Sequence, residues 1–329
     1  MNTCRIPALM VLAVLPAACS IDIDAQSYTA AGSFERTLQV TGPVEIDVQT
    51  GSGSISVRQG PERDVRIVGQ IRANRGFWNN RGAEERVRAL EASPPVVQEG
   101  NSIRIGEITD PELRRNVSIS YQIAVPFDAS LKSRSGSGSV DVESIAGPVE
   151  VRTGSGRVTV GKIPDAVMAE TGSGGIDILG AGKGLNARTG SGGVDARDVA
   201  GPVEAHSGSG RIRIAYSGPG DGNLTTGSGG ISVVGLRGRL RARAGSGSIN
   251  VDGQPTGDWS IDSGSGGITL RLPPDAAFDL NARSSSGGVH TTHPIEARGA
   301  MSRNGLQGRV RGGGPRLDLT TGSGGIRLE

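Results

Sequence analysis

The chain has 329 residues, of which 35 are basic and 33 acidic, and its formal net charge is +2. No strong field of one sign can form over the whole surface, so we do not expect nucleic-acid binding through a basic patch. Glycine and proline are both frequent, at 54 and 17 residues. Such a composition indicates a low-complexity chain unless the glycines recur with a fixed period.

The N-terminal residues have the pattern of an export signal, because a single arginine precedes an apolar run too short to span a membrane permanently. Small residues lead up to Cys19, which is similar to the lipidation motif of bacterial lipoproteins, although Pro16 replaces a preferred aliphatic residue. We expect residues 1–18 to be a signal peptide, Cys19 to be lipidated, and residues 19–32 to be a polar, lipid-anchored tether to the membrane. The alternative is ordinary cleavage nearby, which leaves Cys19 free or removes it.

Residues 33–329 are expected to form one domain. Alternating apolar residues over 42–57 predict a first pair of short strands, and a longer alternating strand is predicted over 117–125.

An irregular insertion over 72–116 separates these strands. Residues 83–92 favour a helix, which a Pro-Pro pair then ends. Phe77 and Trp78 are the aromatic residues best suited to an exposed contact site, and packing against the ends of the coils is an equal alternative.

A Gly-Ser-Gly motif then recurs with nearly constant spacing. Its first glycines are Gly51, Gly136, Gly154, Gly172, Gly190, Gly208, Gly227, Gly245, Gly264 and Gly322, with steps of 18 or 19 residues from 136 to 264. Each repeat holds two Gly-x-apolar-x-apolar units, which predict two short strands with one buried face. We therefore predict an all-β fold: a single-stranded parallel β-solenoid, or β-helix, with 18-residue coils, two short strands per coil and one short helical insertion near the N-terminal end.

The apolar positions of successive repeats are expected to stack into a thin core. The main file is Val140, Val158, Ile176, Val194, Ile212, Ile231, Ile249, Ile268, Val289 and Ile326. The segment 326–329 is predicted to be a strand with no visible cap, and we expect its edge either to be paired or to self-associate through the C-terminal coil.

The glycines suit tight turns, which need either a positive φ or a close approach of two backbones. The serine of each motif is expected to stack on the serine of the preceding coil as a hydroxyl ladder. A catalytic role for these serines is not expected, because ten equivalent serines cannot each have a base in a chain with three histidines.

Two groups of outward-facing residues are candidates for a contact surface. One is a file with one residue per coil, in which neighbours can pair by charge: Arg134, Arg152, Glu170, Arg188, His206, Thr225, Arg243, Asp262 and Arg283. The other is a basic band suited to an anionic envelope polymer: Arg211, Arg213, Arg237, Arg239, Arg241 and Arg243. A solvated face is the alternative for both.

Metal binding and catalysis find little support. Asp141, Asp177 and Asp195 follow a calcium-binding repeat in part, but calcium needs six to eight oxygen ligands and an arginine stands in the same file. His290 and His293 lack a third ligand for zinc. We expect no cofactor, no metal and no enzymatic activity.

Together these features resemble the bacterial putative-adhesin family, a β-solenoid domain of unknown function. The resemblance rests on the Gly-Ser-Gly unit at 44–57, the helix-bearing insertion at 83–92, the strand ending at 125 with the coils after it, and the closing segment 313–326. It covers residues 33–329. The family has no agreed catalytic residues, and its name implies surface adhesion without supplying a ligand.

The resulting hypothesis is an exported, lipid-anchored adhesin that contacts an envelope polymer or a surface protein without catalysis. We expect it at the outer membrane or cell surface. The alternatives are a periplasmic envelope-stress or scaffold partner, a glycan-active enzyme and a calcium-binding repeat protein.

Overall fold

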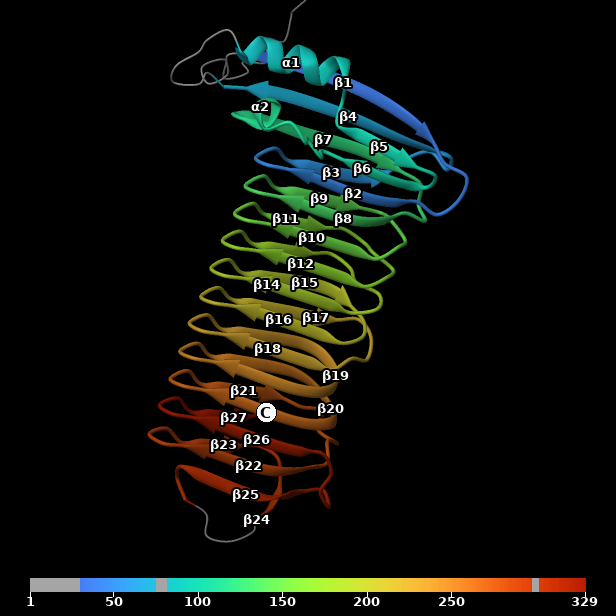
Figure 1. Ribbon diagram of the computed structural model, residues 1–329. Coiled ribbons are helices and arrows are strands. Elements are labelled where there is room, and N and C mark those ends of the chain that lie inside the picture. Colours follow the sequence, from blue (N-terminus) through green and yellow to red (C-terminus); the bar gives the residue numbers. More distant parts are fainter. Residues whose placement is uncertain (1–29, 75–81, 298–301) are drawn as a thin grey trace, which may run out of the picture.

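The computed structural model describes residues 30–74, 82–297 and 302–329, and in this part the chain is a long stack of β-coils (Figure 1). The all-β fold predicted from the sequence is confirmed. Each regular coil contributes one strand to each of two opposed sheets, here called sheet 1 and sheet 2.

Sheet 1 holds the first strand of each regular coil. Its spatial order is β5 (Val96–Glu99), β6 (Ser102–Ile105), β2 (Glu45–Thr50), β8 (Ser130–Ser135), β10 (Val149–Thr153), β12 (Val167–Thr171), β14 (Leu185–Thr189), β16 (Val203–Ser207), β18 (Gly222–Thr226), the second halves of β19 (Ile231–Ala244) and β20 (Ile249–Ser263), β26 (Arg316–Thr321), β22 (Phe278–Ser284), β25 (Gly305–Val310) and β24 (Ile295–Ala297).

Sheet 2 holds the second strand of each regular coil. Its spatial order is β1 (Ala30–Gln39), β4 (Asp64–Ala73), β7 (Val117–Val125), β3 (Ile55–Gln59), β9 (Val140–Glu143), β11 (Val158–Val160), β13 (Ile176–Ile178), β15 (Val194–Val199), β17 (Ile212–Tyr216), the first halves of β19 and β20, β21 (Ile268–Arg271), β27 (Ile326–Leu328) and β23 (Val289–Thr291). The long strands β19 and β20 run through both sheets and join them.

The register between coils follows the repeat length. Val158 lies opposite Val140 on one side and Ile176 on the other, in parallel pairs. These inward side chains are fully buried, and burying one aliphatic side chain is worth about 1.5–3 kcal/mol. A further inward position, which alternation alone does not reveal, places Ile163 and Ala181 at the corner opposite the Gly-Ser-Gly turns.

The serines inside the Gly-Ser-Gly motifs do not form the predicted hydroxyl ladder, because they are exposed. The ladder is built instead by the residue before each motif. The Oγ1 of Thr189 donates to the carbonyl oxygen of Gly174 in the preceding coil (2.9 Å) and accepts from the N–H of Gly192 (3.0 Å). The same two bonds recur at Ser135, Thr153, Thr171, Ser207, Thr226, Ser263, Ser284 and Thr321. The predicted serine ladder is wrong, because strand alternation turns the preceding residue inward.

Glycine is needed in these turns because the backbones stack closely, and not because of a positive φ. Neither Gly190 nor Gly192 has a positive φ. A Cβ on Gly190 would overlap the carbonyl oxygen of Gly172 in the preceding coil, and a Cβ on Gly192 would overlap that of Gly174. Any larger residue would therefore force two coils apart.

Both ends of the stack are out of sequence order. The coil formed by β2 and β3 lies between the later coil β6–β7 and the coil β8–β9. Likewise, β26 and β27 lie between the coil β20–β21 and the coil β22–β23. The C-terminal strand β27 is thus paired on both sides, which is one of the two arrangements expected for it. Apolar alternation fixes which residues face inward but does not fix the order in which coils stack.

The two ends of the stack contain antiparallel pairs beside parallel ones. Antiparallel pairs occur at both ends: β1 with β4, β4 with β7 and β5 with β6 at the N-terminal end, and β22 with β25 and β25 with β24 at the C-terminal end.

The predicted helix is present in the insertion as α1 (Gly82–Ala92), which packs Val87 and Leu90 towards β1 and β4 and so covers the N-terminal end of the core (Figure 1). A one-turn helix, α2 (Pro111–Arg114), begins at Asp110, whose side chain accepts from the N–H of Glu112 at 2.8 Å. In the described residues, neither helix has the length and hydropathy required to cross a bilayer.

Candidate functional site

The outer surface of sheet 1 carries a groove of about 880 Å³. It crosses the starts of β2, β8, β10, β12, β14, β16 and β18, so it follows the long axis of the stack. Its floor includes Pro148, Ala166, Gly184 and Pro202, which occupy equivalent positions just before successive strands. Because each coil adds a short side chain at the same place, the groove is a property of the repeat.

The groove is also lined by outward side chains that share one register position in successive strands: Lys132, Glu150, Met168, Asn186, Glu204 and Asn223. Among these side chains, the Nδ2 of Asn186 donates to Glu204 at 3.4 Å, while its Oδ1 is buried without a hydrogen-bond partner. The lining therefore combines charges of both signs with an unused acceptor.

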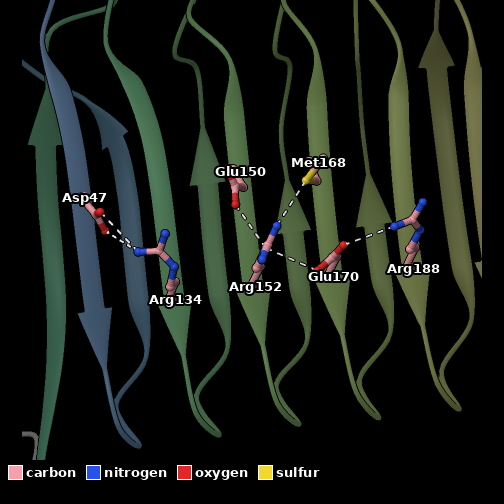
Figure 2. Close-up of polar contacts among 7 residues, drawn as sticks. All are labelled: Asp47, Arg134, Glu150, Arg152, Met168, Glu170 and Arg188. Atoms are coloured by element: carbon pink, nitrogen blue, oxygen red, sulfur yellow. Dashed lines mark hydrogen bonds and ion pairs between the residues drawn. The ribbon is translucent and has the colours of Figure 1, made fainter.

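Ion pairs lie beside the groove along the outward file predicted from the sequence, as one separate pair at Arg134 and one linked run from Arg152 to Arg188 (Figure 2). The Nη1 of Arg134 lies 3.1 Å from Asp47 Oδ1. The Nε of Arg152 lies 3.1 Å from Glu150 Oε1 and 3.4 Å from Glu170 Oε2. Such exposed pairs contribute about 0–1 kcal/mol each, so their main effect is to hold the side chains in place.

The linked run continues through Arg188, which lies 3.8 Å from Glu170 and 2.7 Å from Glu204. The hydrogen bond with Glu204, and then the charge of Glu204, raise the pKa of Arg188. At the corner beside the groove, Lys183 donates to Asp165 at 2.7 Å and thereby lowers the pKa of that carboxyl, with a smaller contribution from the N–H of Ala166. Both shifts favour the charged forms of Arg188 and Asp165.

The predicted basic band does not form one surface. Arg213 points outward from sheet 2, where it lies 3.3 Å from Asp195. Arg241 and Arg243 point outward from sheet 1, and Arg243 lies 3.5 Å from Asp262.

The other band residues lie at the two ends of the coil. Arg211 is exposed in the turn before β17. Arg239 lies at the opposite corner, where its Nε is 3.1 Å from Asp221 Oδ2 and its N–H donates to Oδ1 at 2.8 Å. Arginines that are close in sequence are therefore spread around the coil. Cys19, Phe77 and Trp78 lie outside the described residues.

The candidate metal ligands are separated from one another. His293 is buried and packs edge-on against Phe278, with ring centroids 5.6 Å apart, while His290 is exposed on β23. Asp177 forms an ion pair with Arg157, whose Nη1 lies 2.6 Å from Asp177 Oδ2. Over residues 30–74, 82–297 and 302–329, no group of three or more His, Cys, Asp or Glu side chains could hold a metal ion.

The groove was not among the predicted sites, although the sequence carries a signal for it. Pro148, Ala166, Gly184 and Pro202 recur at 18-residue spacing. Alternation assigns residues to the inside or the outside only, so short side chains at a corner do not by themselves predict a hollow.

A family model described as Toastrack DUF4097 matches residues 98–329. A comparison with curated proteins found no match. Solved structures that resemble the chain include a putative adhesin from Bacteroides fragilis NCTC 9343, which is 14% identical, with 91% of this chain and 97% of that chain covered and a TM-score of 0.36.

Two other similar structures come from different bacteria. A putative cell adhesion protein from Clostridium sporogenes ATCC 15579 is 12% identical, with 90% and 99% covered and a TM-score of 0.22. A putative lipid binding protein from Parabacteroides distasonis ATCC 8503 is 15% identical, with 90% and 96% covered and a TM-score of 0.42.

Proposed function

The chain belongs to the Toastrack DUF4097 family, which confirms the resemblance drawn from the sequence, and from that premise we propose that it is an exported, non-catalytic binding protein of the cell envelope. It is anchored through a lipid on Cys19 and presents a rigid parallel solenoid of 18-residue coils. The groove of sheet 1 holds an extended polymer. The observation that carries this proposal is the direction of the groove, which follows the stack axis and repeats its lining coil by coil.

The lining favours a polymer that donates hydrogen bonds. Glu150 and Glu204 offer carboxylate oxygens, and the buried Oδ1 of Asn186 has no donor. Ligand hydroxyls can donate to such carboxylate oxygens. Because acidic side chains outnumber basic ones in the lining, an uncharged, hydroxyl-rich polysaccharide fits better than a polyanion.

Filling the groove tests this proposal. Met168 lines the groove on sheet 1, and Thr159 points outward at a comparable position on sheet 2, so Met168→Trp and Thr159→Trp form a matched pair. We expect the full-length chain to bind a neutral polysaccharide fraction of the host envelope in biolayer interferometry. Met168→Trp should weaken binding at least tenfold, and Thr159→Trp should leave it unchanged.

Binding to the anionic fraction alone, or an equal loss from both variants, contradicts the groove as the binding site.

Location is tested separately by protease shaving of intact cells, with and without Cys19→Ala. Cleavage on intact cells that disappears in Cys19→Ala supports a lipid-anchored surface protein. Protection until the envelope is opened supports the periplasmic alternative.

A further inference from the structure

A second cavity, of about 780 Å³, lies at the N-terminal end of the stack of Gly-Ser-Gly turns. It is bounded by the first such turn, which begins at Gly51, and by the loop that begins at Gly106 and ends at Asn116. We call it the N-terminal cavity. It exists because β6 pairs with β2 only as far as Ile105, after which the chain turns away at Gly106, where φ is +87°. The coil that should cover the first Gly-Ser-Gly turn is therefore displaced.

Because of this displacement, the N–H of the first glycine in the first Gly-Ser-Gly turn has no backbone acceptor, unlike the equivalent N–H groups of the following coils. In the following coils the N–H of the first glycine donates to the coil before it: Gly136 donates to the carbonyl oxygen of Thr50 at 3.0 Å, and Gly154 donates to that of Gly136 at 2.9 Å. The N–H of Gly51 makes no hydrogen bond with any described residue. Gly51 and Ser52 both line the N-terminal cavity, so a backbone donor is available there.

Tyr121 supplies a second unused donor. This side chain of β7 is only 1% exposed and lines the N-terminal cavity, and its hydroxyl oxygen would lie 3.1 Å from a Cβ placed on Gly106. Its hydroxyl makes no hydrogen bond within the described part of the chain, whereas the hydroxyl of the other buried tyrosine, Tyr216, donates to the carbonyl oxygen of Asp221 at 3.2 Å. Burial raises the pKa of Tyr121, so its hydroxyl stays protonated and is available as a hydrogen-bond donor.

The charged groups around the N-terminal cavity are mainly basic. Arg114 and Arg134 line it, and Arg134 also pairs with Asp47 on the groove side. Glu107 is the one acidic residue in the lining, and its carboxylate lies 4.0 Å from Arg104, outside the lining. A backbone N–H, a buried hydroxyl and two guanidinium groups supply donors to the cavity, and the amide and hydroxyl side chains in the rest of the lining can donate as well as accept.

We propose that the N-terminal cavity binds a small oxyanion, a carboxylate or phosphate group, held by the N–H of Gly51, the hydroxyl of Tyr121 and the guanidinium of Arg114. Oxyanions carry several acceptor oxygens and no obligatory donors, which complements this set. The two oxyanion classes reach an envelope protein from different sources, because carboxylates occur on acidic saccharides and phosphate occurs free or on other polymers. The site does not depend on the groove of sheet 1 or on its ligand.

Calorimetric titration of the full-length chain tests the proposal, with inorganic phosphate, glucuronate and neutral glucose as probes at constant ionic strength. We expect one saturable site for phosphate or glucuronate and none for glucose. A response to phosphate alone assigns the phosphate source, and a response to glucuronate alone assigns the acidic saccharide. Tyr121→Phe and Arg114→Gln should each weaken binding at least fivefold.

Matched controls separate binding from folding. Tyr216→Phe changes a second tyrosine that is buried in the described residues, and Arg115→Gln changes an arginine that faces Glu112 at 3.8 Å and is not in the cavity lining. Both should bind like the unmodified chain. In nuclear magnetic resonance spectra the amide proton of Gly51 should shift on binding. Absence of saturable binding to both oxyanions, or equal binding by Tyr121→Phe and Arg114→Gln and the unmodified chain, overturns the proposal.

Discussion

Thr189 offers the sharpest test of how neighbouring coils are held together. Its side chain is 3% exposed, and valine has nearly the same shape, so Thr189→Val removes two hydrogen bonds without opening a cavity. The carbonyl oxygen of Gly174 and the N–H of Gly192 then lose their partner in a part-buried turn. Each buried group left unpaired costs about 1–3 kcal/mol. Allowing for the more favourable burial of the new methyl group, we expect the free energy of unfolding to fall by about 2–4 kcal/mol.

The assay is urea unfolding of the full-length chain followed by circular dichroism, with hydrogen exchange of the Gly192 amide as a local readout. Ser191→Ala is the matched control, because it removes the exposed hydroxyl of the same turn and should change stability by less than about 0.5 kcal/mol. If Ser191→Ala is as destabilising as Thr189→Val, or if exchange at Gly192 does not accelerate in Thr189→Val, the ladder has been assigned to the wrong residue.

Three further changes probe other features. Ala244 occupies a ladder position that lacks a hydroxyl, so Ala244→Ser should raise the free energy of unfolding by about 1 kcal/mol in the same assay, and a loss would contradict the ladder. Burial, and then the charge of Glu143, raise the pKa of Asp141 despite Arg58, so the ionised carboxylate opposes folding once the pH rises above the unfolded-state pKa. Asp141→Asn should therefore be more stable than the unmodified chain at pH 7, and this gain should vanish below about pH 4, where the carboxyl is protonated in both states; a gain independent of pH would refute it. Ending the chain at Pro315 removes β26 and β27, so limited proteolysis should degrade β22–β25 while the regular coils survive, and uniform resistance would contradict the inserted order.

The sequence by itself determined the repeat, the all-β class and the identity of the core. Alternation with period two specifies which residue faces inward, so the buried file through Val158 and Ile176 could be predicted directly. Charge pairing along the outward file was also predictable, because a fixed period places Arg152 next to Glu170. The helix in the insertion followed from its local composition, since helix propensity depends on neighbouring residues only.

Tertiary structure alone decided the features that depend on residues far apart in the chain. The inserted position of β26 and β27 is a choice among strand partners that present the same apolar pattern, so alternation cannot distinguish them. The groove of sheet 1 comes from short side chains brought side by side by coil stacking. The N-terminal cavity comes from one coil that departs at Gly106 and uncovers the N–H of Gly51 and the hydroxyl of Tyr121, which are 70 residues apart in sequence. Local patterns describe how a strand faces the core, whereas a site forms where separate coils meet or fail to meet.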